Sequence, residues 1–274
     1  MTARVALPSR GRLREAVGEL LAQAGLPASG RARSVEAGIE FIEMRPRDAG
    51  AWLGTGRLDA AFVSTDIVME EDLAALAAVP LGLARSTLVV AVREEDNRVL
   101  PADLAGASVA THLPRATEAW LAGKGVAAQV VTMGGALEGV CAAGVADAIV
   151  DLRESGNSLA QNHLRVLAEI ADCEALFVHN GDDGLGELVL RLSAVVEARA
   201  QRYVMLHLPR SRLSQLSSVF HGLAAPTVLP LAERDDLVAV HLVLSAAAFW
   251  SGLGRLRELG ASGIVALAPE ALLK

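Results

Sequence analysis

The sequence is poor in aromatic side chains and in cysteine, and it contains no long uncharged apolar run. Aromatic residues make up 3% of the 274 residues, so few rings are available for stacking bases, and a net charge of −7 argues against a general nucleic-acid partner. The two cysteines, Cys141 and Cys173, stand singly among apolar neighbours, which is typical of buried structural thiols. No stretch approaches a membrane span, and the chain becomes charged too early for a signal peptide. We therefore expect a cytoplasmic protein without nucleic-acid or membrane partners.

Hydrophobic residues, in contrast, are abundant at 52%, and the length allows two or three compact units. Short apolar runs alternate with helical patterns, which favours an α/β fold. We expect strands at residues 4–7, 39–44, 58–63, 87–92, 108–111, 129–132 and 146–150, and helices at residues 12–24, 47–53, 114–123, 137–143 and 187–201.

The composition changes near Arg202, where a third unit is expected to begin. Strands at 203–208, 227–231, 236–244 and 263–267 and helices at 213–220 and 247–259 give the order strand-helix-strand-strand-helix-strand. This order predicts a ferredoxin-like sandwich. Such a domain, placed after a complete catalytic body, suggests regulation or oligomerisation, and a purely structural cap is the alternative.

The most informative segment covers residues 138–159. An apolar run at 146–150 ends in Asp151, and the small residues Ser155, Gly156, Asn157 and Ser158 lead into a helical run from Leu159. A strand, a tight loop and a helix N-terminus together favour an anion such as phosphate, and a carboxylate beside them suits sugar hydroxyls. The pattern therefore points to a phosphoribosyl site, with an ordinary serine-capped helix as the alternative. No lysine follows the glycine, so the loop is not a nucleotide P-loop.

Several motifs resemble one family in the same order along the chain. The segment just described looks like the signature of ATP phosphoribosyltransferase, the first enzyme of histidine biosynthesis. Further matches are Pro8-Ser9-Arg10-Gly11-Arg12-Leu13, Arg45-Pro46-Arg47-Asp48 with Gly56 and Asp59, and, near the end, Gly222-Leu223, Pro226-Thr227, Pro230-Leu231-Ala232 and Leu259-Gly260-Ala261. The resemblance covers nearly the whole chain and includes the C-terminal domain of the long form.

The resemblance implies a two-lobed catalytic body like a periplasmic binding protein, followed by the ferredoxin-like regulatory domain. Residues 1–88 and 173–201 would form the first lobe, residues 89–172 the second lobe with the phosphoribosyl-phosphate loop, and residues 202–274 the third domain. It further implies a hexamer with histidine as feedback inhibitor. The implied reaction transfers phosphoribose from 5-phosphoribosyl 1-pyrophosphate (PRPP) to N1 of ATP. This inverting displacement releases pyrophosphate through an oxocarbenium-like state, with Mg²⁺ carried by the PRPP pyrophosphate and no metal ligand on the protein.

The resemblance also assigns roles to individual residues. Asp151 would bind the ribose hydroxyls, and Arg10 and Arg12 would meet the pyrophosphate from the opposite lobe. Substrate-binding residues would be Glu138, Glu154, Ser155, Gly156, Asn157, Ser158, Leu159, Arg45, Asp48, Asp66 and Arg115. Thr227 and His207 are the candidate contacts of an effector.

The chain departs from the family pattern at three places around the expected cleft. Ser64-Thr65 stands where the family has glycine and a basic residue, Gly82 to Thr87 lacks a cation before Leu88, and Leu113 to Ala119 replaces a Tyr-Pro-Asn stretch and its basic followers. Arg115 adds a charge that the family pattern lacks. Two alternatives to the family reaction therefore stay open: a paralogue that uses PRPP with a less charged nucleophile, and a non-catalytic binding or regulatory protein.

Overall fold

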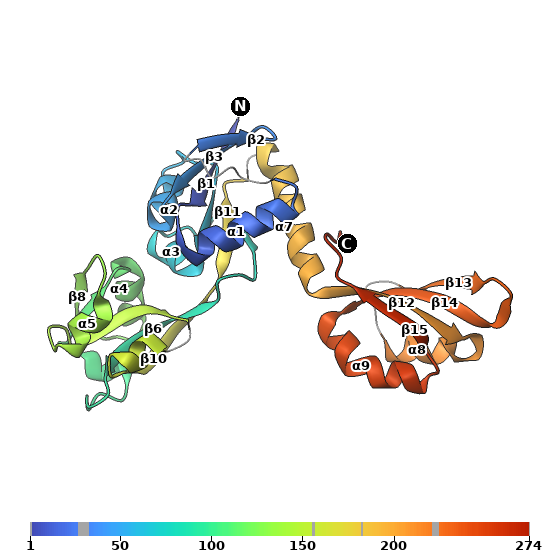
Figure 1. Cartoon of the computed structure of the whole chain (residues 1–274). Coiled ribbons are helices and arrows are strands. Elements are labelled where there is room, and N and C mark those ends of the chain that lie inside the picture. The colour runs from blue at the N-terminus through green and yellow to red at the C-terminus, as the bar shows by residue number, and fades with distance from the viewer. Residues whose placement is uncertain (1, 27–32, 155–156, 182, 221–224, 274) are drawn as a thin grey trace. The chain divides into compact units, whose positions relative to one another are not determined.

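The computed structural model describes residues 2–26, 33–154, 157–181, 183–220 and 225–273. The chain divides into two compact units, Met1–Gly186 and Glu187–Lys274. The first unit contains two sheets, which we call lobe I and lobe II, and the second contains one sheet (Figure 1). The α/β class and the two-lobed body expected from the sequence are therefore confirmed. No helix among the described residues is long and apolar enough to cross a membrane.

Lobe I carries a six-stranded sheet in the order β2-β3-β1-β4-β11-β5. Strand β1 pairs in parallel with β3 and β4, whereas β11 runs antiparallel to β4 and β5. Each of β1, β3 and β4 leads directly into a helix, so the starts of α1, α2 and α3 follow one edge of the sheet. The elements of lobe I are β1 (Ala3–Pro8), α1 (Gly11–Gln23), β2 (Arg33–Glu36), β3 (Ile39–Met44), α2 (Pro46–Gly54), β4 (Ala60–Ser64), α3 (Thr65–Glu70), β5 (Ala77–Pro80) and β11 (Ala175–His179).

Lobe II carries a five-stranded sheet in the order β10-β6-β9-β7-β8. Strands β7, β8 and β9 are parallel, so the residues that follow β7 and β9 share one edge of the sheet. The elements are β6 (Ser86–Arg93), the 3-10 turn η1 (Pro101–Leu104), β7 (Ser108–Thr111), α4 (Pro114–Gly123), β8 (Gln129–Thr132), α5 (Leu137–Ala142), β9 (Ala148–Arg153), α6 (Asn157–Gln161) and β10 (Leu164–Cys173).

The chain crosses between the lobes twice, before β6 and after β10, and the two crossings are hydrogen-bonded to each other. Ala175 N donates to Leu83 O at 2.8 Å, and Leu81 N donates to Ala175 O at 3.0 Å. Gly82 N donates to the Glu174 carboxylate at 2.9 Å. These bonds tie the two crossings into a double connection at the back of the cleft.

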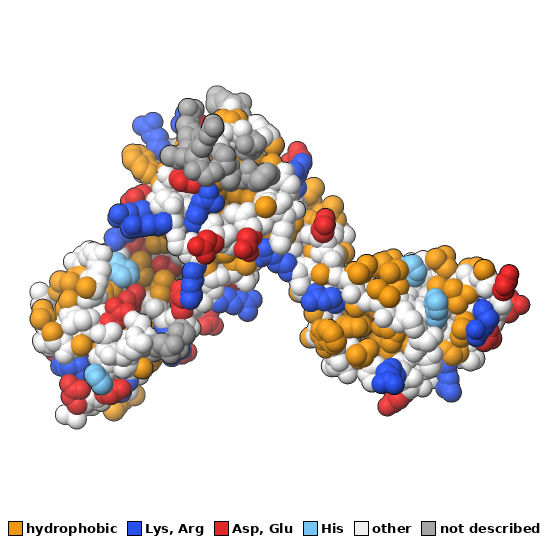
Figure 2. Space-filling model, viewed as in Figure 1, with side chains coloured by type: hydrophobic (Ala, Val, Ile, Leu, Met, Phe, Trp, Pro, Cys, Tyr) orange, Lys and Arg blue, Asp and Glu red, His pale blue; other side chains and the backbone are white. Residues whose placement is uncertain are grey.

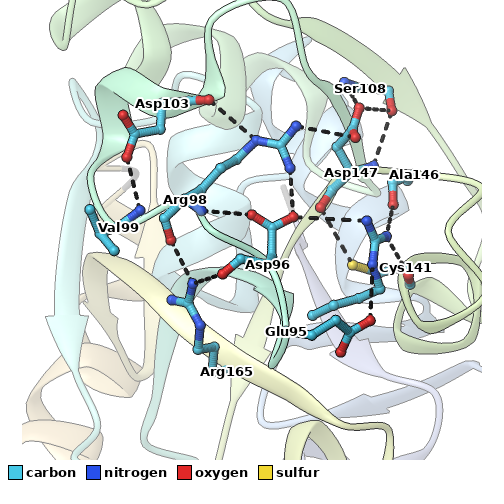
Figure 3. Close-up of polar contacts among 11 residues, drawn as sticks. Glu95, Asp96, Arg98, Val99, Asp103, Ser108, Cys141, Ala146, Asp147 and Arg165 are labelled. Atoms are coloured by element: carbon cyan, nitrogen blue, oxygen red, sulfur yellow. Dashed lines mark hydrogen bonds and ion pairs between the residues drawn. The ribbon is translucent and has the colours of Figure 1, made fainter.

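A polar cluster holds the turn after β6 against β7, β9 and β10 (Figure 3). The Arg98 guanidinium donates to Asp96 at 2.6 Å and to Asp147 at 3.2 Å, and Arg165 donates to the carbonyl oxygens of Asp96 and Arg98. Asp147 Oδ2 also accepts from Ser108 N and Ser108 Oγ, both at 2.8 Å. The cluster therefore fixes the amino end of β9, the strand that carries Asp151 at its other end.

Replacing Asp147 by asparagine is expected to lower the free energy of unfolding by about 1–2 kcal/mol, because the bonds to Ser108 and Arg98 lose their charged acceptor. The Ser108 N–H, the Ser108 hydroxyl and Arg98 hold the pKa of Asp147 below its usual value. A carboxyl group whose pKa is lowered in the folded state stabilises the protein at pH values above its unfolded pKa of about 3.9. The difference in stability between wild type and variant should therefore persist at pH 7 and shrink as the solution is made more acidic.

Urea unfolding across this pH range measures the difference in stability. Glu118→Gln, at an exposed position of α4, is the control, and equal effects of the two variants would contradict the prediction.

The second unit is a four-stranded antiparallel sheet in the order β13-β14-β12-β15, with its two principal helices on one face (Figure 1). This is the order of a ferredoxin-like sandwich and confirms the fold expected for the third domain. The sheet is preceded by the 3-10 turn η2 (Asp183–Leu185) and the helix α7 (Gly186–Arg199). The elements that follow are β12 (Gln201–Pro209), the 3-10 turn η3 (Arg210–Arg212), α8 (Leu213–Val219), β13 (Thr227–Leu231), β14 (Arg234–Ser245), α9 (Ala246–Glu258) and β15 (Ser262–Leu267).

Two sequence-based expectations about the 138–159 segment are corrected. Strand β9 runs on to Arg153, so Asp151 lies inside the strand rather than after it, because pairing with β6 continues to Arg153. The helix that follows is α6, of five residues, which is too short to supply the dipole that the loop argument assumed. Ser155 and Gly156 lie outside the described residues.

Candidate active site

Asp151 faces the cleft from β9 and is held by a histidine that follows β7. His112 Nε2 lies 3.2 Å from Asp151 Oδ1, and the same oxygen accepts from Leu152 N at 2.7 Å. The hydrogen bond to Asp151 raises the pKa of His112, opposed by partial burial and assisted by the charges of Asp151 and Asp66. The neighbouring carboxylate thus stabilises the charged form of the imidazole.

A small cavity of about 190 Å³ opens beside this pair. The hydroxyl of Ser158 donates to the Glu138 carboxylate at its wall, and the side chain of Leu159 is buried there. The residues lining the cavity are Val89, Glu138, Asp151, Leu152, Arg153, Glu154, Ser158 and Leu159. The structure thus brings together five of the residues that the sequence assigned to the phosphoribosyl site.

Arg12 reaches across from lobe I and forms an ion pair with Glu154 of lobe II. Its side chain is 75% exposed, so the pair is screened by solvent and can open at little cost when a stronger anion competes. Arg10 is also exposed and precedes α1, and Gly11 between the two arginines has φ +79°, a conformation that favours glycine. Both arginines therefore lie at the edge of lobe I where α1 begins.

A second set of contacts joins the lobes through a buried acid. The side chain of Glu70 on α3 is 2% exposed, accepts from Ala116 N at 3.0 Å and pairs with Arg47 at 3.4 Å. Arg47 also donates to the carbonyl oxygen of His112 at 2.7 Å. Arg115 donates to Glu70 O and pairs with Glu71, so its charge is already engaged in this lobe contact.

Asp66 lies at the start of α3 and is 5% exposed, and its Oδ1 atom has no hydrogen-bond partner. Burial raises the pKa of this carboxyl group. Arg45 and Asp48 lie exposed at the start of α2, on the same sheet edge. All three residues lie where helices begin at this edge of lobe I, and none of them lines the small cavity, so their substrate contacts stay a prediction.

A larger cavity of about 500 Å³ adjoins the first and shares Arg153 and Glu154 with it. It lies where the two crossings meet lobe I, and charged side chains surround the hollow between the lobes in Figure 2. Thr65, one of the departures from the family pattern, is engaged here: its hydroxyl donates to Glu174 O and accepts from Glu174 N. The residues lining this cavity are Thr65, Arg85, Ser86, Thr87, Arg153, Glu154, Asp172, Cys173 and Glu174.

Both cysteines are buried free thiols, as the sequence indicated. Burial raises the pKa of the Cys173 thiol to about 11, so it is protonated at neutral pH and a poor nucleophile although it lines the larger cavity.

In the second unit the two candidate effector residues lie exposed on the sheet, His207 on β12 and Thr227 on β13. Thr227 is paired in register with His241, whose Nδ1 lies 2.7 Å from the Tyr203 hydroxyl. Tyr203 and His241 were not identified from the sequence.

The sequence also did not predict three residues of the site region: His112 beside Asp151, and Arg47 and Glu70 as contacts between the lobes. His112 carried a signal, because it is a titratable residue between a buried strand and a proline-initiated helix, inside a segment that departs from the family pattern. Glu70 gave no signal, since an acid near a helix end is usually solvated.

Comparisons with known proteins give matches over nearly the whole chain. The family model described as ATP phosphoribosyltransferase matches residues 45–194, and the one described as HisG, C-terminal domain, matches residues 198–270. The chain is similar to the ATP phosphoribosyltransferase of Methanocella arvoryzae, with 32% identity over 99% of both chains, and to that of Rhodopirellula baltica, with 35% identity over 95% of this chain and 90% of the relative. Among solved structures it resembles the ATP phosphoribosyl transferase (HisG:HisZ) complex from Thermotoga maritima, with 26% identity and a TM-score of 0.62 over 71% of this chain and 98% of that one.

Proposed function

The chain belongs to the ATP phosphoribosyltransferase family, and we propose that it moves phosphoribose from PRPP to N1 of ATP by an inverting displacement in the cleft between lobes I and II. It is a phosphoribosyltransferase of histidine biosynthesis. The observation that carries the proposed location is the cavity shared by Glu138, Asp151, Glu154 and Ser158. Its volume of about 190 Å³ is below the range of about 300–1,000 Å³ typical of ligand pockets, so we assign it only the ribose 5-phosphate part of PRPP.

In this proposal Asp151 accepts hydrogen bonds from the ribose hydroxyls and offsets the positive charge that develops at the anomeric carbon. Ser158, with Ser155, Gly156 and the backbone of Asn157 and Leu159, binds the 5-phosphate. Glu138 orients the Ser158 hydroxyl. Arg12 exchanges its partner Glu154 for the pyrophosphate, and Arg10 assists from the same edge. The protein therefore contributes mainly orientation and charge, as expected when the leaving group is a stable anion.

Among the described residues no group of three or more His, Cys, Asp or Glu side chains lies close enough to hold a metal ion. In this proposal Mg²⁺ accompanies the PRPP pyrophosphate, where phosphate oxygens and water supply the ligands. When bound there, Mg²⁺ would neutralise the leaving diphosphate. Arg12 would then approach a diphosphate whose negative charge is already partly neutralised by Mg²⁺.

We assign the larger cavity to ATP. The chain lacks the family cation at Thr65, and three acids, Glu154, Asp172 and Glu174, line the same space. Two arginines line it as well: Arg153 is paired with Glu169, and Arg85 is the cation that we assign to the triphosphate. Asp48, Arg45 and Asp66 border the cleft from lobe I. Arg115 is assigned to closing the lobes through Glu71 rather than to the substrate.

Replacing Arg85 by alanine is expected to raise the KM for ATP about tenfold and to leave the KM for PRPP within about twofold, because one charge-assisted phosphate contact is lost. Steady-state pyrophosphate release at varied ATP and fixed PRPP measures the change. Arg57→Ala, on the opposite side of lobe I, is the matched control. Equal effects of Arg85→Ala on both KM values would contradict the assignment of this cavity to ATP.

The test of the proposed function is pyrophosphate release from PRPP and Mg²⁺ with and without ATP. ATP-dependent release supports the family reaction. PRPP binding without ATP turnover would favour a different, less charged acceptor, and absence of PRPP binding would overturn both and leave a non-catalytic homologue.

We further propose a hexamer in which histidine acts as effector at the second unit, with Thr227 and His207 as candidate contacts. The match of this unit to the C-terminal domain family supports the proposal. Calorimetric titration with histidine and light scattering test the two parts separately.

A further inference from the structure

The acidic side chains of the cleft would repel the negatively charged substrate proposed for it. Glu138, Asp151 and Glu154 line the small cavity, yet the substrate proposed for it carries several phosphate charges. The cavity is also lined by Arg153, which is paired with Glu169, and Glu154 is paired with Arg12, so Asp151 is an acid that neither arginine neutralises. A carboxylate is a good acceptor for ribose hydroxyls, but its negative charge repels such a substrate. A cation behind the carboxylate would leave the acceptor in place and remove the repulsion.

The structure provides that cation at His112. Its Nε2 lies 3.2 Å from Asp151 Oδ1, which also accepts from Leu152 N. Because Oδ1 already has two partners, we expect Oδ2 to be the oxygen that accepts from the ribose hydroxyls. The imidazole is about one-third exposed and Asp151 about one-fifth, so solvent only partly screens the pair.

The position of His112 is fixed from both lobes. Its backbone follows β7, and its carbonyl oxygen accepts from Arg47 of lobe I at 2.7 Å. Arg47 in turn pairs with buried Glu70. The histidine is thus held where α2 and α3 of lobe I meet the site edge of lobe II.

We infer that His112 is a positioning residue for the phosphoribosyl transfer: it anchors Asp151 through Oδ1 and, when protonated, cancels the charge that would repel PRPP. This inference rests on the proposed function, since it presumes that Asp151 faces the ribose. Three charged groups face the imidazole from the surrounding elements: Asp151 from β9 and Asp66 from α3 favour its charged form, and Arg47 from α2 opposes it. Their balance raises the pKa of His112 above its ordinary value.

The KM for PRPP is expected to depend on pH through the protonation of His112. A raised pKa keeps the imidazolium up to a higher pH than for an ordinary histidine, and the charge is lost as the pH rises through that pKa. The KM for PRPP should therefore increase on the alkaline side in the wild type. His112→Gln keeps a hydrogen-bond donor without a titratable charge, so its KM should be about tenfold higher at neutral pH and should lack this alkaline increase. His112→Ala removes donor and charge and should raise the KM further.

The experiment measures KM for PRPP, kcat and the pH profile for the wild type and both variants, together with thermal melting and calorimetric PRPP binding. His163→Gln, an exposed histidine paired with Glu94 outside the cleft, is the matched control and should retain the wild-type profile. If the wild type shows no ATP-dependent turnover, the proposed function fails. If the wild type turns over and His112→Gln keeps both its KM and its alkaline limb, the inference about His112 is overturned. A variant that melts early but keeps its PRPP affinity also counts against it, because a structural role alone would give that result.

Discussion

Replacing Asp151 by alanine is expected to lower kcat/KM for PRPP by about a thousandfold or more. In the proposed function the variant loses the acceptor of ribose hydroxyl bonds, each worth about 1.5–3 kcal/mol when one partner is charged. It would also lose a negative charge that stabilises the carbon that becomes positive in the transition state. Finally, it leaves the His112 imidazole without the carboxylate that lies 3.2 Å from its Nε2 atom. These losses act together, so the effect should appear in kcat as well as in KM.

Asp151→Asn separates these contributions, because it keeps the size and one acceptor oxygen but removes the charge. We expect it to fall between the wild type and Asp151→Ala in kcat/KM. Asp103→Asn, in the same lobe but outside the cleft, is the matched control; Asp103 accepts from Val99 N and Leu100 N and touches neither cavity. A decrease of less than tenfold for Asp151→Ala, in a protein whose melting is unchanged, would show that this carboxylate does not face the ribose.

The sequence predicts the parts of this site that depend on local order. Apolar strands followed by helix starts predict which residues lie along the sheet edges, and Glu138, Asp151, Glu154 and Ser158 indeed line one cavity. The exact end of β9 was not predictable, because Asp151 to Arg153 are held in the strand by pairing with β6, some 60 residues earlier. Sequence periodicity does not report such pairing.

The contacts between the lobes could not be predicted from the sequence. Arg47 and His112 are 65 residues apart, and Arg115 and Glu70 are 45 apart. Each is a charged or titratable residue near the start or end of a helix or strand, a position where solvent exposure is the usual expectation. Only the fold shows that Glu70 is buried and that Arg115, a substrate-binding candidate in the sequence, contacts Glu70 and Glu71.

The strands β10 and β11 were also missed, although β11 completes lobe I. Its sequence, ALFVH, is a short apolar run without alternation, which periodicity alone does not distinguish from a buried turn of helix. In the structure it lies between β4 and β5 and brings the chain back into the first sheet. Lobe I is therefore closed by a segment that comes about 100 residues after the rest of its sheet.

Phe177, in the middle of β11, gives the second large prediction: Phe177→Ala is expected to lower the free energy of unfolding by about 3–5 kcal/mol. The side chain is 0% exposed, faces Phe62 with ring centroids 4.8 Å apart, and pairs in register with Phe62 on one side and Val79 on the other. Its removal leaves a cavity between two strands that cannot close without shifting the sheet. Such a loss is a large fraction of the 5–15 kcal/mol typical of a whole domain, so lobe I should unfold at markedly lower urea concentration.

Urea unfolding monitored by circular dichroism measures this loss, and Trp52→Ala is the matched aromatic control because Trp52 is 52% exposed. We expect the control to change stability by no more than about 0.5 kcal/mol. Phe177→Leu should fall between them, since leucine fills part of the space. Asp151 and Glu154 lie in lobe II, so Phe177→Ala should reduce turnover only when lobe I begins to unfold. A variant that stays as stable as Trp52→Ala would mean that β11 does not close the sheet of lobe I.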